Sequence, residues 1–266
     1  MKATNREELY RETLTELSLA HRHMAQRAYD KDGVCLSLAC RWIREIHAAD
    51  IWMGWSLKQS PTDRLARVLL DIRDVVVRHK AYLAQRDANE AKVAQLRAWD
   101  LVRREAAALR DAKLSEGDNA AFVEAVKQAR GWVAQANGSW VTQPERALAQ
   151  AYGLGLEGVG SWALGDDDAA HATLTKALRN LPTSTAHLVL WRGTGAKAES
   201  HAVGLYKTHG AFWQDWYVFD PNFGEFKFNS LAKAATAVWQ TGMYLGMNSV
   251  RLVEARKSQP AAGAAA

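Results

Sequence analysis

The hydrophobic pattern of the chain changes its period once, close to Pro182. Before that proline, apolar residues recur every three or four positions, which is the spacing of amphipathic helices. After it, the period becomes two, in short runs separated by Gly-containing turns, which is typical of antiparallel strands. Helices followed by strands predict an α+β fold, with an N-terminal helical part packed on a C-terminal antiparallel sheet.

The pattern places the individual elements as follows. Helices are expected over residues 5–28, 34–55, 120–136, 168–181 and 231–239. Residues 61–102 predict either a helical hairpin or one long bent helix. Strands are expected over residues 187–191, 201–206, 216–219, 225–228 and 250–253, and a Gly-rich loop over residues 153–165. We expect a single domain over residues 1–258, with a helical insert at about 58–137 and a flexible tail at 259–266.

Composition excludes several classes of protein. The 266 residues are 48% hydrophobic and 24% charged, as in an ordinary globular chain. The sequence contains no apolar run of the roughly 18 residues that a membrane-spanning helix needs, so no integral membrane segment is expected. The first twelve residues are charged and lack the apolar core of a secretory signal peptide. We therefore expect synthesis in the cytoplasm and, for any export, a route that needs no signal peptide.

The net charge of +5 comes from one segment. Residues 58–113 hold thirteen Lys or Arg and eight Asp or Glu, and the rest of the chain is neutral. Because the acidic residues are interspersed, a solvated helix face explains this segment better than a nucleic-acid site. We expect no nucleic-acid partner. A non-catalytic adaptor that binds through this basic segment stays open, and charge reversal at Arg97, Arg103 and Arg104 would test it.

The two cysteines differ in their positions on the second expected helix. Five positions separate Cys35 from Cys40, so their side chains point about 140° apart and form no disulfide. Cys35 follows Gly33 and opens the helix, where the helix dipole and free backbone N–H groups favour a thiolate and stabilise an oxyanion. Cys40 lies within the apolar pattern and behaves as a small hydrophobe. Cys35 is thus the candidate nucleophile.

A thiol nucleophile needs a base, and the base needs an acceptor that orients it. His201 begins one expected strand, and Asp220 ends the next. Antiparallel pairing brings the start of one strand beside the end of its neighbour, so we expect these two side chains to meet. Each has an ordinary alternative, since His201 also suits a half-buried sheet position and Asp220 suits a turn before Pro221.

These residues carry a family resemblance. Three motifs resemble those of the YopT/AvrPphB-type papain-like cysteine proteases, which are bacterial effectors. They are Gly-Val-Cys at the start of a Trp-containing helix, His-Ala-Val-Gly at 201–204, and Asp-Pro-Asn-Phe-Gly-Glu at 220–225. The resemblance implies a papain-like fold in which Cys35 is the nucleophile, His201 the general base and Asp220 the residue that orients the imidazole. It also implies secretion and delivery into a target cell, where the substrate is a protein such as a prenylated small GTPase, a kinase or a protein of a rival bacterium. A cognate inhibitor or immunity protein is a further expected partner.

Other roles at the site follow from position. Papain-like enzymes place an amide a few residues before the cysteine for the oxyanion, and here the candidates are Gln26 and Asp30, although an ionised Asp donates no hydrogen bond. Gly33 would let the backbone approach the substrate. Trp213 and Trp216 are expected to flank the cleft, with core packing as their ordinary alternative.

Two further patterns are set aside. The Gly-x-Gly-x-x-Gly match over residues 153–158 lacks the preceding strand of a dinucleotide site, and Asp166–Asp168 with His171 is explained by helix capping. We therefore expect no metal and no cofactor. A deamidase, transglutaminase or acyltransferase with the same triad stays open, because these enzymes share the acyl-enzyme step.

Overall fold

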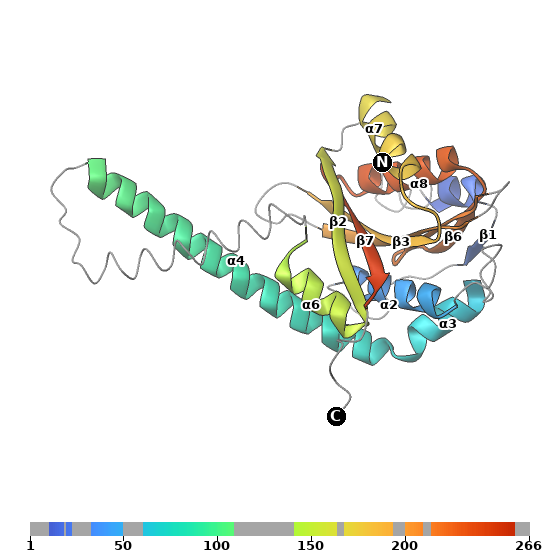
Figure 1. Ribbon diagram of the computed structural model, residues 1–266, viewed down its shortest axis with the longest axis horizontal. Helices are drawn as coiled ribbons and strands as arrows, with labels where there is room; N and C mark the ends of the chain where they lie inside the picture. The colour runs from blue at the N-terminus through green and yellow to red at the C-terminus, as the bar shows by residue number, and fades with distance from the viewer. Residues whose placement is uncertain are drawn as a thin grey trace.

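Seven antiparallel strands form one sheet in the order β1-β6-β5-β4-β3-β7-β2 (Figure 1). The computed structural model describes residues 11–18, 20–22, 33–49, 61–108, 141–163, 168–193, 200–209 and 214–258. The strands are β1 Ala20–Arg22, β2 Leu154–Ala163, β3 Thr185–Arg192, β4 Ser200–Lys207, β5 Trp216–Asp220, β6 Gly224–Phe228 and β7 Ser249–Lys257. The helices are α2 Cys35–Ala48, α3 Pro61–Leu70, α4 Ile72–Ala108, α6 Gln143–Ala151, α7 Asp168–Arg179 and α8 Leu231–Tyr244.

Each face of the sheet has its own hydrophobic core. Helices α2, α3 and α6 cover one face, and α7 and α8 cover the other (Figure 1). Strand residues alternate between the two cores, as the pleat of a sheet requires: in β3, Leu188 and Leu190 face α2, whereas Val189 and Trp191 belong to the core beneath α8. The predicted α+β fold, with helices packed on an antiparallel sheet, is confirmed.

A single indole fixes the depth at which α2 lies on the sheet. Trp42 is fully buried and stacks on Phe219 of β5, with ring centroids 5.6 Å apart and planes 12° apart. On β4, a Cβ at Gly204 would come within 2.5 Å of the same ring. Glycine at this position therefore lets the helix that begins at Cys35 reach the centre of the sheet.

A buried ion pair joins the same helix to α3 and β6. The Arg64 guanidinium contacts both carboxylate oxygens of Glu225, and both side chains are almost completely buried. The indole N–H of Trp42 donates to Glu225 Oε2 at 2.7 Å, and Arg64 also lies over the ring of Tyr217 at 5.3 Å. With these partners the pair ties three elements together, which fits a charge pair that is costly to break.

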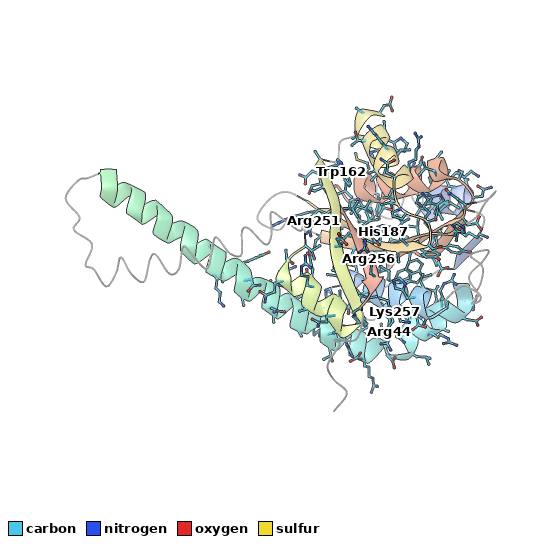
Figure 2. The ribbon with its side chains drawn as sticks, viewed as in Figure 1. Arg44, Trp162, His187, Arg251, Arg256 and Lys257 are labelled. Atoms are coloured by element: carbon cyan, nitrogen blue, oxygen red, sulfur yellow. The ribbon has the colours of Figure 1, made fainter. Side chains whose placement is uncertain are left out.

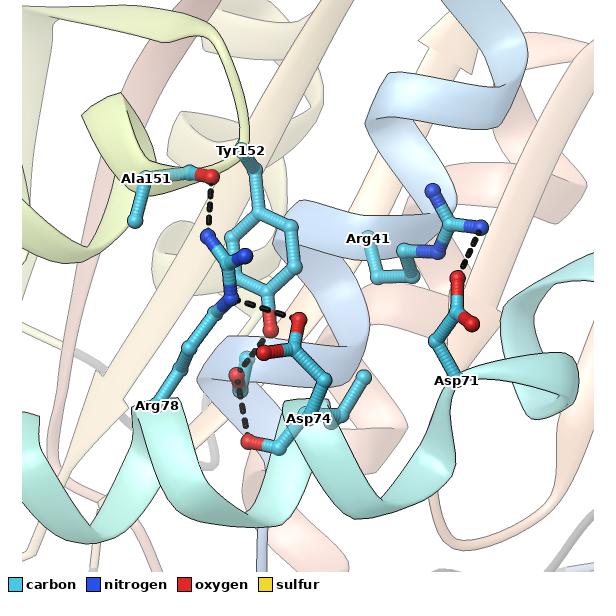
Figure 3. A network of polar contacts seen from close by, with 8 residues as sticks. Arg41, Asp71, Asp74, Arg78, Ala151 and Tyr152 are labelled. Carbon is cyan, nitrogen blue, oxygen red and sulfur yellow. Dashed lines mark hydrogen bonds and ion pairs between the residues drawn. The ribbon is translucent and has the colours of Figure 1, made fainter.

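The base of α4 is bonded to α2 and to the end of α6 (Figure 3). Ser37 donates to the Val75 carbonyl at 3.0 Å, so Tyr152 donates its hydroxyl proton to Ser37 Oγ at 2.6 Å. Arg78 donates to the Ala151 carbonyl and lies over the Tyr152 ring at 5.1 Å. The start of the 37-residue helix α4 is therefore fixed to the body of the protein.

Helix α3 and helix α4 meet at Asp71, so residues 61–108 form the bent-helix alternative of the two predicted. The helix expected over residues 120–136 and the second half of the predicted insert lie outside the described residues. Within the described part of the chain, no helix is both long enough and apolar enough to span a membrane.

Two sequence predictions are wrong. The helix expected over residues 5–28 is helical over 11–17, but residues 20–22 form β1 and pair with β6. The Gly-rich loop expected over 153–165 contains β2, which pairs with β7 along its whole length. In β2 the glycines accompany a register shift between Gly158 and Gly160, which is a usual place for glycine in a strand. In both cases backbone pairing to a neighbouring strand outweighs local propensity.

Helix α6 was not predicted, although its signal is present. Thr142 and Glu145 form a reciprocal capping box, and Pro144 occupies the first turn. Thr-x-x-Glu before a helical run is a recognised helix start, so the capping residues identify this nine-residue helix better than its short apolar pattern does.

Removing one partner of the buried ion pair should be costly. We expect Arg64→Met to lower the free energy of unfolding by about 3–5 kcal/mol, because Glu225 stays charged and buried. Adding Glu225→Gln should recover part of that loss, since the amide oxygen still accepts from Trp42. Urea unfolding measures both, with Arg67→Met on the exposed face of α3 as the matched control. If Arg64→Met were as stable as Arg67→Met, the conclusion that the buried ion pair is costly to break would be contradicted.

A second buried polar group makes the fold sensitive to acid. His187 on β3 (Figure 2) is fully buried, and neither ring nitrogen has a hydrogen-bond partner among the described residues. Burial lowers the pKa of His187 to about 4; Lys207 and Arg256 lower it as well, and Glu254 opposes them. In the unfolded chain His187 therefore binds a proton near pH 6.5, whereas in the folded chain it binds one only near pH 4.

Stability should consequently fall as the pH drops from 6.5 toward 4, by at most about 3 kcal/mol from this residue. His187→Leu, which loses no hydrogen bond seen in the structure, should flatten that part of the stability profile. Thermal unfolding followed across this pH range measures the difference. His209→Leu, which changes an exposed histidine, serves as the control and should keep the wild-type slope. Equal slopes in wild type and His187→Leu would refute the explanation.

Candidate active site

Cys35 is the first residue of α2 and has a half-buried thiol. Gly33, two positions earlier, has a φ of 77°, a left-handed conformation that suits glycine and turns the chain into the helix. The first helical hydrogen bond runs from the Leu38 N–H to the Val34 carbonyl at 2.9 Å. The N–H groups of the first turn thus have no carbonyl partner within the helix, which leaves them available to an oxygen beside the thiol.

His201 bridges the thiol and a carboxylate. Its Nε2 lies 3.0 Å from Asp220 Oδ1, and since a carboxylate only accepts, Nε2 carries the hydrogen. The Cys35 thiol lies beside the same imidazole and helps to raise its pKa, and Nδ1 is the ring nitrogen left to face the sulfur. His201 and Asp220 are both buried, at 5% and 1% exposure. The structure therefore brings together the three residues that the sequence singled out.

Asp220 is positioned by the turn that follows it. Its Oδ1 also accepts from the Asn222 N–H at 2.8 Å, and the Phe223 N–H donates to its carbonyl at 3.0 Å. Gly224 then adopts a φ of 112° and starts β6. The Asp-Pro-Asn-Phe-Gly sequence thus forms an Asx turn that leaves the carboxylate facing His201.

Burial and charge act on the imidazole in opposite directions. Burial lowers the pKa of His201, but the charge and hydrogen bond of Asp220, aided by Cys35, outweigh it and raise the pKa to about 10. The raised pKa favours the imidazolium at neutral pH, and this ring lies between the Asp220 carboxylate and the Cys35 sulfur. Cys40, by contrast, is fully buried, and burial raises the pKa of its thiol far above the usual range. Its interpretation as a core residue agrees with this position.

The remaining predicted site residues have different positions. Gln26, Asp30 and Trp213 lie outside the described residues. Trp216 is 1% exposed and belongs to the core beneath α8, where Lys207 lies over its ring at 5.2 Å. Lys207 in turn donates to the Leu181 carbonyl at 2.7 Å, just after α7 ends. A ring this deeply buried packs the core, so the expectation that Trp216 flanks a substrate cleft is corrected.

One neighbour of the site was missed in the sequence. Trp191 lies directly opposite His201 in the β3–β4 pairing and stacks on its ring. The signal was available: runs 187–191 and 201–206 were both expected strands, and a symmetric hairpin between them pairs residue 191 with residue 201.

Comparison with known proteins identifies the family of the chain. The Peptidase C58 family model, described as Yersinia/Haemophilus virulence surface antigen, matches residues 11–252. The chain belongs to this family. It is the YopT/AvrPphB family of cysteine peptidases that the motifs resemble. No curated protein sequence matches the chain.

Solved structures were also found among the similar proteins. The crystal structure of the Pseudomonas avirulence protein AvrPphB has a TM-score of 0.50 and 17% identity, covering 91% of this chain and 99% of that one. PatoxP, a cysteine protease-like domain of the Photorhabdus asymbiotica toxin PaTox, has a TM-score of 0.43 and 10% identity, covering 97% of this chain and 60% of that one. The likeness to AvrPphB is one of fold, and the predicted papain-like architecture is confirmed.

Neutralising the carboxylate should lower the basicity of the imidazole. In a Cys35→Ala background, we expect Asp220→Asn to lower the pKa of His201 by at least about 1, because the amide keeps the turn but carries no charge. Stability gained from the raised pKa is complete below pH 6.5 and is lost as the pH rises toward 10, so the Asn variant should lose less over that range. An NMR titration of the imidazole measures the pKa.

Asp215→Asn is the matched control, since Asp215 pairs with Lys227 at 2.7 Å and has no recorded contact with His201. Asp215→Asn should leave the pKa of His201 unchanged. If Asp220→Asn also left this pKa unchanged, the Asp220 carboxylate would not be the group that raises it.

Proposed function

We propose that the protein is a cysteine endopeptidase in which Cys35 is the nucleophile, His201 the general base and acid, and Asp220 the residue that orients the imidazole. The observation that carries this proposal is the contact of one buried imidazole with a carboxylate on Nε2 and with a thiol at a helix N-terminus. Membership of a cysteine peptidase family supports the same reading. The arrangement supplies nucleophile, base and orienting acceptor in one place.

The proposed reaction runs in two stages. The Cys35 thiolate attacks the carbonyl carbon of a substrate peptide, and the N–H groups at the start of α2 stabilise the oxyanion. The His201 imidazolium gives its proton to the leaving amine, and a thioester between Cys35 and the acyl part of the substrate remains. His201 then takes a proton from water, which attacks the thioester, releases the carboxylic acid and restores the thiolate beside the imidazolium. Gln26 and Asp30 stay as proposed oxyanion residues, and Gly33 and Trp213 as proposed substrate contacts.

We further propose that residues 1–258 act as one catalytic domain with a helical insert at about 58–137 that helps to hold the substrate. The proposed substrate is a protein inside a target cell, reached by secretion from the bacterial cytoplasm without a signal peptide. The description of the family as a virulence antigen supports this setting. A cognate inhibitor or immunity protein is proposed as a further partner.

Thiol reactivity tests the triad directly. We expect iodoacetamide to label Cys35 rapidly well below the pKa of about 8.5 of a free cysteine, because an imidazolium beside the sulfur favours the thiolate. Cys40 in the same sample serves as an internal control and should stay unlabelled while the protein is folded. Peptide mass spectrometry reads both sites. His201→Ala should abolish the rapid labelling, and slow labelling of Cys35 in the wild type would exclude an activated pair.

The class of reaction is tested by the products. Lysate of a candidate target cell is incubated with wild type or with Cys35→Ala, and new protein N-termini are sequenced. Termini that appear with wild type and not with the variant support an endopeptidase. Mass changes on Gln or Lys side chains without new termini would favour the deamidase, transglutaminase or acyltransferase alternative. A biological effect that survives in Cys35→Ala would favour the adaptor.

A further inference from the structure

The indole of Trp191 covers one face of the His201 imidazole. The two residues face each other across β3 and β4, their ring centroids are 5.9 Å apart, and their planes differ by 20°. Trp191 is 1% exposed and lies in the core beneath α8. The imidazole thus has Asp220 and Cys35 at its edge and an aromatic ring on its face.

An aromatic face attracts a cation and does little for a neutral ring of the same shape. The attraction comes from the negative potential above the π system, and it strengthens where water is excluded. A parallel contact also holds the ring plane, and this plane determines whether both nitrogens reach their partners. We propose that Trp191 is a positioning residue of this active site, which holds the protonated His201 imidazole by its face; the proposal rests on the peptidase function proposed above.

The effect of Trp191 on His201 can be distinguished from the effects of the charged neighbours of His201. Among the described residues, the titratable groups that act on His201 are Asp220 from β5 and Cys35 from α2. Trp191 comes from β3, carries no charge and touches the ring on its face. Substituting it therefore leaves both charged partners present and changes only the surface against which the imidazolium rests.

The dependence of Cys35 alkylation on pH isolates this effect. The rate constant for iodoacetamide should have a lower inflection, where the thiolate forms beside the imidazolium, and an upper one, where the imidazolium loses its proton. The imidazolium is present on both sides of the lower inflection, so Trp191 should affect only the upper one. We expect Trp191→Leu to lower the upper inflection by about half a pH unit or more, roughly a threefold rise in the dissociation constant of the imidazolium.

Trp191→Phe should recover most of the shift, because a benzene ring keeps an aromatic face. The matched control is Trp216→Leu, which removes an equally buried indole from the same core without a recorded contact to His201. It should lower the thermal stability and leave the upper inflection unchanged. If Trp191→Leu does not fold, Trp191→Met, which keeps more of the volume, takes its place with the same expected shift.

An unchanged upper inflection in a folded Trp191→Leu or Trp191→Met would overturn the inference, and so would an equal shift in Trp216→Leu. A failure of the peptidase proposal would give another result. The pH profile of Cys35 alkylation would then not depend on His201, and His201→Ala would have the same profile as the wild type. A His201-dependent wild-type profile with no shift in the Trp191 variants would remove the inference alone.

Discussion

The structure depends on how closely α2 packs against the centre of the sheet. The nucleophile candidate lies on the helix and its base on the sheet, so their separation is set by helix–sheet packing and not by any local loop. Trp42 fills the space that Gly204 leaves open, and Glu225 binds the indole N–H while it pairs with Arg64 of the next helix. Burying two opposite charges is costly unless they are bonded to each other and to further partners, and here both conditions are met.

The Asp-Pro-Asn-Phe-Gly-Glu sequence serves three separate ends. Asp220 accepts from a turn N–H and from the imidazole, Gly224 takes the positive φ that ends the turn, and Glu225 faces the opposite core as the partner of Arg64. Glu225 lies opposite Phe219 in the β5–β6 pairing, and Phe219 is the neighbour of Asp220 in β5. Because neighbouring residues in a strand point to opposite faces, one short motif supports both the site and the packing of α2. A family motif of this kind is therefore as much a packing motif as a chemical one.

The sequence predicted those parts that depend on local signals. The strands around His201 and Asp220 have a clear period of two, and the turn after Asp220 has distinctive residues, so their meeting followed from antiparallel pairing alone. Strands β1 and β2 were missed because their own residues are ambiguous and their state is decided by β6 and β7, which lie far away in the chain. The pairing of Arg64 with Glu225 spans 161 positions and could not be derived from spacing. The burial of Trp216 likewise depends on α7 and Lys207. The sequence around a tryptophan near a strand end does not indicate whether its side chain faces the core or the cleft.

The proposed triad joins residues at very different distances along the chain. His201 and Asp220 are 19 positions apart and belong to consecutive strands, whereas Cys35 reaches them only through the packing of a helix from the other end of the protein. Bringing Cys35 to His201 and Asp220 closes the longer loop of chain. This closure costs more conformational entropy and requires that both hydrophobic cores have formed. A chain in which α2 has not packed against the sheet would therefore hold the proposed base and its acceptor without the thiol. Under this proposal, reactivity at Cys35 would report on whether α2 is packed against the sheet, and so on the integrity of the whole molecule.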